Sequence, residues 1–396
     1  MACSRKVPDR GMLCPKCKAK TETLKGEFMT WKAFAVLFKV LGVLALSYFT
    51  AWACVMYSYW AKPAPMQDDE LSGFRGPVDV VFTWVDGDDD AWREAQRHWR
   101  DVDNMGAQDP RRNPAPGLDK DELYFSLRSV LHFMPWVRRV YILTQRPHAP
   151  QWVRDKGCEK VHIVHHDEVF ASSAPLPSFS GLLNKSQAHR ISGLSEHFIM
   201  MDDDFFIGRP LQPGHFFDRD GRPVYKMSFP MAPWTKREQW ASILRTTHRV
   251  TREVARSPWM LYLNHVPVPL VKSACQTTSA QLEARDISLS RHRRASEPEF
   301  HYIVANTLLA QGQTRRPHAS FKAQHITQAA KVHRQVRELQ TKTPHVFCIN
   351  SAFDAAVVRS LEQLYGSWLS PSVGGQSPRR HTSQIEYHRR LTGSFR

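Results

Sequence analysis

The hydrophobic positions begin as one long apolar stretch and continue as short apolar runs between amphipathic segments. Residues 33–61 carry a single charge, Lys39, and residues 40–60 alone are long enough to cross an apolar layer about 30 Å thick. Lys39 can extend its ammonium toward the nearer headgroups. The aromatic residues that suit the far membrane interface are Tyr57, Tyr59 and Trp60. The pattern predicts one transmembrane helix at 33–61.

The charges on the two sides of this stretch differ in sign. The basic residues before it are Arg5, Lys6, Arg10, Lys16, Lys18, Lys20, Lys25 and Lys32. After Lys62 come the acids Asp68, Asp69 and Glu70. Because basic segments stay on the cytosolic side, residues 1–32 are expected to form a cytosolic tail and the remainder to lie in a lumen or outside. A cleaved signal peptide is the rival interpretation, but the run begins late and lacks a clear small-x-small cleavage site.

Residues 62–77 are polar and contain Pro and Gly, which predicts a short stem. Buried strands are then expected in "VDVVFTW" from 78, "VRRVYILTQ" from 137, "KVHIVHHDEVF" from 160 and "SEHFIMMDDDFFIG" from 195. Helices are expected in "AWREAQRHWR" from 91 and "DELYFSLRSVLHFM" from 121, the latter stopped by Pro135. This alternation predicts an α/β fold with a largely parallel sheet and flanking helices.

Aspartates gather at the ends of two of these strands, in 86–90 and 202–204. In parallel sheets ligands bind at the carboxyl ends of the strands, and hard oxygen ligands select Mg²⁺ or Mn²⁺. The acids at 88–90 precede a predicted helix and are better explained as caps of its first turn. Asp86 is expected to be aimed by a tight turn at Gly87. The acids Asp202, Asp203 and Asp204 are wedged between apolar residues, which is costly unless they are paired or bind a metal.

The composition narrows the choice of partners. Lys and Arg number 54 against 38 Asp and Glu, for a formal net charge of +16. A basic surface suits phosphates and acidic headgroups as well as plain solubility. The sequence lacks zinc-finger, RNP and basic-aromatic patterns, so nucleic acid is not an expected partner.

The cysteines do not indicate a metal site. "CPKC" at 14–17 is only half of a zinc site. Beyond the span, Cys158, Cys275 and Cys348 permit one disulfide whose pairing stays open.

These motifs resemble the Stealth family of sugar-1-phosphate transferases. "DVVFTWVDGDDDAW" is similar to its first region, and "DELYFSLRSVLHFMPWVRRVYILTQRPHAPQWV" to its second, which continues through "VHIVHHDEVF" and "LPSFSGLLNKSQAHRISGLSEHFIMMDDDFFIGRPL". "LNHVPVPLVKSA" and "FCINSAFDAAVVRSLEQLYGSWLSPS" echo a third and a fourth region. The resemblance is dense over about 78–217. It implies a glycosyltransferase-like catalytic domain at 78–370.

The resemblance also implies a reaction. A UDP- or GDP-hexose gives its sugar-1-phosphate to a hydroxyl of a glycan or glycoprotein, which forms a phosphodiester and releases a nucleoside monophosphate. Such a reaction needs a cation, guanidinium groups on the phosphates and a base for the hydroxyl. His265 is the favoured base, with Asp86, Arg190 and His189 as further catalytic candidates. The expected metal ligands are Asp202, Asp203 and Asp204. The expected substrate- or phosphate-binding residues are Arg128, Trp84, Gly87, Asn264 and Asn350.

The chain departs from the family pattern in three places, the first of which is Asp202, where the family usually has Asn. Lys185 stands where an acid is common, and Ser351 and Ala352 stand where acids often follow Asn350. Two other functions therefore stay open: a metal-dependent glycosyltransferase that releases a nucleoside diphosphate, and a non-catalytic membrane protein that binds glycans.

The remaining expectations concern domains and location. Residues 279–338 could form a helical subdomain, and residues 371–396 are predicted to be a flexible tail. Topology and reaction class together suggest a single-pass type II protein of the Golgi.

Overall fold

The structure is a computed structural model. It describes residues 15–61, 63–104, 122–150, 153, 159–228, 239–257, 260–326, 332–349, 357, 359 and 361. The chain divides into two compact units, Met1–Lys62 and Pro63–Arg396.

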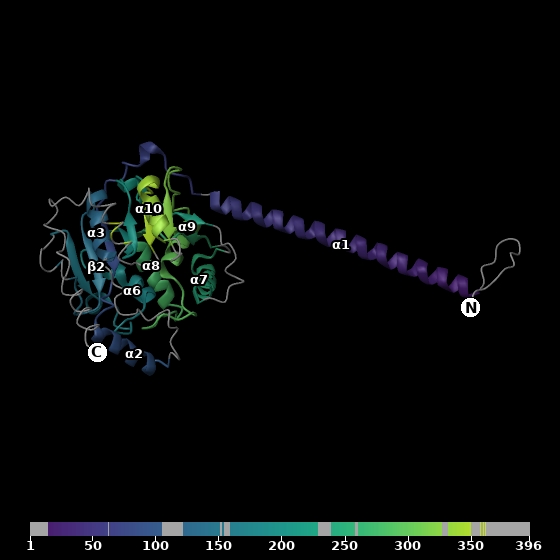
Figure 1. Cartoon of the computed structure of the whole chain (residues 1–396), viewed down its shortest axis with the longest axis horizontal. Coiled ribbons are helices and arrows are strands. Elements are labelled where there is room, and N and C mark those ends of the chain that lie inside the picture. Colours follow the sequence, from purple (N-terminus) through teal and green to yellow (C-terminus); the bar gives the residue numbers. More distant parts are fainter. Residues whose placement is uncertain are drawn as a thin grey trace, which may run out of the picture. The chain divides into compact units, whose positions relative to one another are not determined.

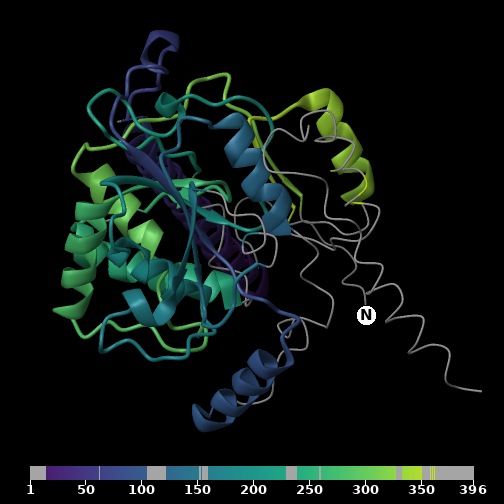
Figure 2. The ribbon, with the colours of Figure 1, turned by 90° about the vertical axis from the view of Figure 1, so that its left-hand side faces the viewer.

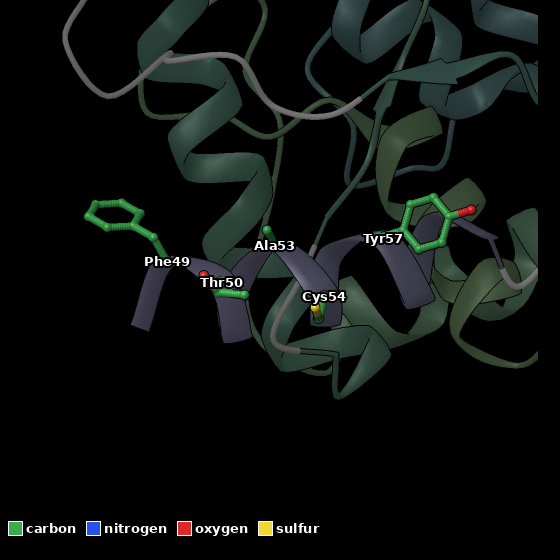
Figure 3. A pocket seen from close by; sticks show the side chains of 5 residues that line it. All are labelled: Phe49, Thr50, Ala53, Cys54 and Tyr57. Carbon is green, nitrogen blue, oxygen red and sulfur yellow. The ribbon is translucent and has the colours of Figure 1, made fainter. Parts of the chain in front are cut away.

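The described part of the first unit is one helix, α1 (Pro15–Ala61), which Figure 1 shows as a continuous rod. Its segment Ala33–Val55 has a mean hydropathy of 1.9 and is long and apolar enough to cross a membrane. Membrane anchors and signal sequences share this length and composition. Figure 3 shows one stripe of α1, where Thr50, Ala53 and Cys54 leave a shallow hollow between the rings of Phe49 and Tyr57.

The second unit is built on a five-stranded sheet in the order β3-β2-β1-β4-β8. The strands are β3 (Val161–His165), β2 (Val140–Thr144), β1 (Val78–Thr83), β4 (His197–Asp202) and β8 (Val268–Val271). The first four run parallel and β8 runs antiparallel to β4. The predicted α/β fold with a largely parallel sheet is confirmed.

Alternate residues of each strand enter two different cores. Val80, Phe82 and Ile142 face α3 (Glu122–Phe133), whereas Val81 and Leu143 face a core that contains helices α7 (Gln239–Ala255), α8 (Lys272–Glu283) and α9 (Phe300–Ala310). Figure 2 shows the blue α3 on one side of the sheet and the green helices on the other. Because both faces are covered, the strands are continuous apolar runs rather than alternating ones.

A second, three-stranded sheet has the order β5-β10-β9, from β5 (Phe205–Ile207), β10 (Val346–Ile349) and β9 (Ala323–Ile326). The sequence predicted one strand over 195–208, but the structure divides it into β4 and β5. Asp202 is the last residue of β4 paired with β1, and Phe205 already pairs with Cys348 of β10. The chain must turn at Asp203 and Asp204 to pass from one sheet to the other, so these acids lie at the junction.

The remaining elements are shorter or lie at the periphery. They are η1 (Asp68–Glu70), α2 (Asp90–Val102), α5 (His166–Val169), α6 (Gly181–Gln187), η3 (Ala188–Arg190), η4 (Pro213–His215), β6 (Met227–Ser228), β7 (Tyr262–Leu263) and α10 (Val332–Lys342). The helical subdomain at 279–338 stays a prediction. Its described part includes α9, which is largely buried in the core with α7 and α8, and also the strand β9.

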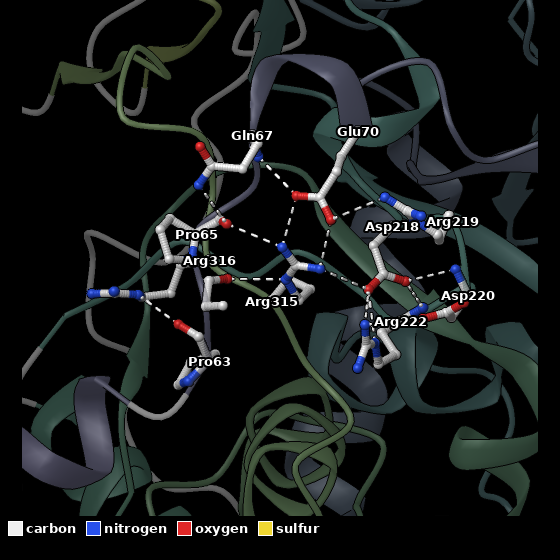
Figure 4. A network of polar contacts seen from close by, with 11 residues as sticks. Pro63, Pro65, Gln67, Glu70, Asp218, Arg219, Asp220, Arg222, Arg315 and Arg316 are labelled. Carbon is white, nitrogen blue, oxygen red and sulfur yellow. Dashed lines mark hydrogen bonds and ion pairs between the residues drawn. The ribbon is translucent and has the colours of Figure 1, made fainter.

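The segment after Lys62, predicted as a stem, is held by a charged network in its own unit (Figure 4). Arg315 donates to Glu70 at 2.8 Å and to Asp218 at 3.4 Å, and Arg316 donates to the Pro63 carbonyl at 2.7 Å. The hydrogen bond from Arg315 is the main cause that lowers the pKa of Glu70. Met66 is only 1% exposed. Residues 63–74 therefore pack against the folded unit rather than extend from it.

Candidate active site

Both aspartate clusters lie at one edge of the main sheet. Thr83, the last residue of β1, pairs with Asp202, the last residue of β4, and both strands run in the same direction. The acids that follow β1 and those that follow β4 therefore emerge side by side. This arrangement confirms that the clusters lie at carboxyl ends of neighbouring strands, where parallel sheets bind ligands.

The first cluster, residues 86–90, uses its carboxylates locally. Asp86 accepts a hydrogen bond from the Asp88 backbone N–H at 2.9 Å, which closes the turn at Gly87. Asp89 is the N-cap of α2 and accepts from the Ala91 N–H at 2.9 Å. Asp90 pairs with Arg93 and its side chain is 95% exposed. The prediction that the acids before α2 cap its first turn is confirmed for Asp89.

His148 fastens this loop from the segment after β2. Its Nδ1 accepts from the Asp86 N–H at 3.2 Å, and its Nε2 lies 2.8 Å from Asp89 Oδ2. The bond from His148 is the main cause that lowers the pKa of Asp89. Trp84 contacts the His148 ring at a centroid distance of 6.3 Å, and the Gly87 carbonyl accepts from Arg93 at 2.9 Å. Asp86 thus has a fixed position at the sheet edge.

The second cluster, Asp202–Asp204, is far more enclosed. The side chains of Asp202 and Asp204 are 21% and 18% exposed. Asp204 Oδ1 is buried without a hydrogen-bond partner, while Asp204 Oδ2 accepts from the Cys348 thiol at 3.2 Å. Burial, followed by the charges of neighbouring aspartates, raises the pKa of Asp203 to about 7 and that of Asp204 to about 7. The charge of Lys185 opposes this rise at both carboxyls but is outweighed by burial and by the neighbouring aspartates.

Lys185 of α6 neutralises one member of the cluster. Its Nζ lies 2.6 Å from Asp202 Oδ1 and 2.7 Å from Asp202 Oδ2. Burial opposes both charges, but the mutual attraction prevails, so the pKa of Asp202 is lowered and that of Lys185 is raised. The departure from the family pattern at Lys185 therefore places a cation directly on the acidic cluster.

His265, in the loop after β7, completes the constellation. Its Nε2 is 3.9 Å from Asp204 Oδ2, and its ring stands edge-on to Phe205 at 4.7 Å. Burial lowers the pKa of His265 to about 4. The imidazole is therefore neutral near pH 7 and can accept a proton. Its neighbour Asn264 is held by its backbone N–H to the Lys226 carbonyl at 2.9 Å, and Asn264 Oδ1 is buried without a partner.

A divalent cation fits this group of side chains. Ligand atoms of Asp202, Asp204 and His265 lie within 4.8 Å of one another. The set is rich in carboxylate oxygen, which suits Mg²⁺ or Mn²⁺. The buried Asp204 Oδ1 without a partner offers a further ligand position.

Three predicted site residues make their observed contacts elsewhere. Arg190 pairs with Glu283 of α8 at 3.1 Å, and the buried His189 stacks on Phe300 of α9 at 6.0 Å. Burial lowers the pKa of His189 to about 4. Arg128 donates to the Tyr124 hydroxyl at 2.7 Å from α3. Their roles in the site stay predictions, and Asn350 lies outside the described residues.

The structure adds residues that the sequence did not indicate. His148 braces the Asp86 loop, and His325 of β9 lies with its ring 4.7 Å from that of His265. Cys348 of β10 is a free thiol, as is Cys275, and Cys158 lies outside the described residues. The pairing of β10 with β5 brings Cys348 to the site, and the pairing of β9 with β10 brings His325 there. No local signal in the sequence indicates either pairing.

Comparison with known proteins places two segments in one family. Residues 76–97 match conserved region 1 of Stealth proteins, and residues 117–225 match conserved region 2. Both aspartate clusters and Lys185 fall within these matches.

Three similar curated proteins are bacterial polysaccharide phosphotransferases. An exopolysaccharide phosphotransferase of Streptomyces coelicolor is 42% identical over 147 residues, which are 37% of this chain and 24% of the relative. Another from the same organism is 30% identical over 295 residues, or 70% of this chain and 52% of the relative. A capsular polysaccharide phosphotransferase of Neisseria meningitidis serogroup B is 35% identical over 164 residues, or 41% of this chain and 42% of the relative.

The chain thus spans between about a quarter and about half of the length of these relatives. Among solved structures, the galactosyltransferase LgtC in complex with donor and acceptor sugar analogs is similar with a TM-score of 0.37 and 11% identity, over 77% of this chain and 99% of LgtC. With its conserved regions 1 and 2, the chain belongs to the Stealth family and is related to bacterial capsular and exopolysaccharide phosphotransferases.

Proposed function

We propose that the protein transfers a sugar-1-phosphate from a nucleotide sugar, a UDP- or GDP-hexose, to a hydroxyl of a glycan. The acceptor oxygen forms a bond to the phosphorus that carries the sugar. The bond from that phosphorus to the bridging oxygen of the diphosphate breaks, and a nucleoside monophosphate leaves with this oxygen. The product is a phosphodiester. The relatives named as polysaccharide phosphotransferases support this reaction class.

The observation that carries the proposal is the enclosed group of Asp202, Asp204 and His265 at the junction of the two sheets. Buried carboxylates with raised pKa values favour a bound cation, and phosphoryl transfer depends on such a cation. A Mg²⁺ or Mn²⁺ ion would neutralise the charge of the diphosphate. A neutral imidazole beside these acids can take the proton of an acceptor hydroxyl.

Each nearby residue then has a defined task. His265 accepts the proton at Nε2, and Lys185 fixes the orientation of Asp202. The carboxylates of Asp202, Asp203 and Asp204 are proposed to bind the cation. Asp86, Trp84 and Gly87 lie on the neighbouring loop that His148 braces and are proposed to contact the substrate. Because a guanidinium matches phosphate oxygens in pairs, Arg128 and Arg190 remain the proposed phosphate contacts, with His189 orienting the phosphate or sugar. Asn264, and Asn350 beyond the described residues, are proposed to bind substrate.

We further propose that α1 anchors the protein as a single-pass type II membrane protein with the second unit in the Golgi lumen. The apolar segment Ala33–Val55 and the basic residues before it support this topology. Carbonate extraction of membranes followed by protease protection tests it. Protection of the second unit, together with retention in the membrane pellet, is the expected result, whereas release into the supernatant would indicate a cleaved signal.

The reaction is tested with the full chain in detergent, Mn²⁺ or Mg²⁺, UDP- and GDP-sugars, and mannose- or galactose-ended acceptors. The measurement is the identity of the released nucleotide. We expect a monophosphate, lost in the Asp203→Ala and His265→Ala variants. Release of a diphosphate would show a glycosyltransferase and overturn the proposal. Glycan binding without turnover of any donor would favour a binding protein.

A further inference from the structure

A second group of potential metal ligands lies against the proposed catalytic group and has different chemistry. His265, His325 and Cys348 place one ligand atom each within 4.8 Å of one another. They come from three separate segments: the loop after β7, strand β9 and strand β10. Neither the His325 imidazole nor the Cys348 thiol has a task in the proposed phosphoryl transfer, so their convergence with His265 requires its own explanation.

Strand register holds two of these ligands together. β9 and β10 run parallel, and His325 is paired directly with Cys348. Side chains of paired residues on neighbouring strands project to the same face of the sheet. His265 approaches from the adjacent loop, with its ring 4.7 Å from that of His325. The backbone of the second sheet therefore fixes the separation of the nitrogen and sulfur donors.

A fourth donor is already in contact with this group. Asp204 Oδ2 accepts from Cys348 Sγ at 3.2 Å and lies 3.9 Å from His265 Nε2. Asp204 Oδ1 is buried and lacks a hydrogen-bond partner. The buried Cys348 forms the inner side, and the exposed His325 forms the outer side through which an ion could enter.

The donor set of one sulfur, two nitrogens and one oxygen selects the class of ion. Mg²⁺ and Mn²⁺ prefer oxygen, whereas thiolate with imidazole favours Zn²⁺ and similar transition ions in tetrahedral sites. Bonds of about 2.0–2.3 Å place tetrahedral ligand atoms roughly 3.3–3.7 Å apart. The ligand atoms of His265, His325 and Cys348 lie within 4.8 Å of one another, and binding of an ion would draw them closer together.

We propose that His265, His325, Cys348 and Asp204 form a binding site for a zinc-class ion. On binding, the Cys348 thiol loses its proton to solvent and the sulfur lone pair bonds to the ion, so one proton is released per thiolate formed. The two ion groups share His265 and Asp204. The consequence for catalysis rests on the proposed function. A zinc-class ion would occupy His265, the proposed base, and Asp204, a proposed ligand of Mg²⁺ or Mn²⁺, and would thereby inhibit transfer.

The test of binding uses Co²⁺, which substitutes for Zn²⁺ and reports its ligands by absorption. We would titrate Co²⁺ into the full chain in detergent and record the sulfur-to-cobalt charge-transfer band. The wild type is expected to show this band, and Zn²⁺ is expected to abolish it by displacement. Cys348→Ser should lose the band, while Cys275→Ser, which alters a second buried free thiol in the other core, should retain it.

His325→Ala is the second variant, because its exposed side chain can be removed without opening the core. It should weaken Co²⁺ binding by about tenfold or more. Absence of the band in the wild type, or its persistence in Cys348→Ser, would overturn the proposal. This result does not depend on whether the protein transfers sugar-1-phosphate. If transfer is established, Zn²⁺ should inhibit the wild type at lower concentration than His325→Ala, and equal inhibition would overturn the inhibitory role.

Discussion

The two aspartate clusters lie at the carboxyl ends of the paired strands β1 and β4, yet their carboxylates have different surroundings. In the loop at 86–90, backbone N–H groups, Arg93 and His148 satisfy the carboxylates, and the pKa of Asp89 is lowered, chiefly by His148. In the turn at 202–204, burial dominates, and the pKa values of Asp203 and Asp204 rise to about 7. Only Asp202 has a fixed cationic partner, Lys185.

The difference follows from what comes next in the chain. A helix follows the first cluster and offers unpaired N–H groups and a favourable dipole to its acids. A strand of the second sheet follows the other cluster, and its N–H groups are used in the ladder with β10. Carboxylates that accept hydrogen bonds from nearby groups contribute to the stability of the fold. Carboxylates that lack such bonds retain affinity for a cation. The second cluster is therefore the proposed reaction centre, and Asp86 alone of the first cluster is proposed to join it.

The largest expected effect is on catalytic activity, which should fall when the second aspartate cluster is altered but not when the first is. Asp204→Asn removes a proposed cation ligand and should lower kcat/KM for sugar-1-phosphate transfer by about 10³-fold or more. Asp90→Asn, at an exposed carboxylate of the first cluster, should change it less than about twofold. Steady-state assays of nucleotide release measure both. A comparable loss in the two variants would remove the distinction between the clusters.

The ion pair of Lys185 with Asp202 should contribute more to stability than the ion pair of Arg93 with Asp90. Lys185→Met leaves Asp202 enclosed and uncompensated and should lower the free energy of unfolding by about 2–4 kcal/mol. Arg93→Met, at the more exposed pair with Asp90, should cost less than about 1 kcal/mol. Urea unfolding in detergent without divalent ions gives both values. Added Mn²⁺ should restore part of the loss in Lys185→Met, since it supplies the missing charge, and no restoration would argue against cation binding there.

The brace of the first loop should have a smaller effect on stability. His148→Ala removes the contacts to the Asp86 N–H and to Asp89, and should lower the free energy of unfolding by about 1–2 kcal/mol. Because the loop positions Asp86, transfer should fall as well, through kcat rather than cation affinity. A parallel measurement of Mn²⁺ binding checks this division. Weakened Mn²⁺ binding in His148→Ala would mean that the two clusters act as one cation site.

The smallest effect concerns pH. The pKa of Asp89 is lower in the folded protein than its value near 3.8 in the unfolded chain. The ionised Asp89 therefore contributes to the free energy of unfolding above pH 3.8, and this contribution is lost as the pH falls through the folded pKa. Asp89→Asn keeps the helix cap but removes the charge. The difference in unfolding free energy between wild type and Asp89→Asn, less than about 1 kcal/mol, should shrink from about pH 6 to about pH 3. A difference that stays constant would mean that the charge contributes nothing.

The sequence predicts those parts of the fold that rest on local patterns. The apolar runs at β1, β2 and β3 are continuous because both faces of the sheet are buried, and they can be recognised in the sequence. The position of Asp89 just before α2 likewise identifies it as the N-cap. The break between β4 and β5 was missed, because "IMMDDDFFI" is apolar on both sides of the acids and only the pairing with β10 forces a turn. The partners Lys185, His148 and His325 depend on contacts between distant segments, which spacing along the chain does not reveal.

The central claim is that the second cluster, and not the first, binds the cation of the reaction. Titration of Mn²⁺ into the full chain, followed by electron paramagnetic resonance, measures this without knowledge of the donor sugar. We expect wild type and Asp90→Asn to bind Mn²⁺ equally and Asp204→Asn to lose binding by at least about tenfold. Equal binding by Asp204→Asn and wild type would contradict the account.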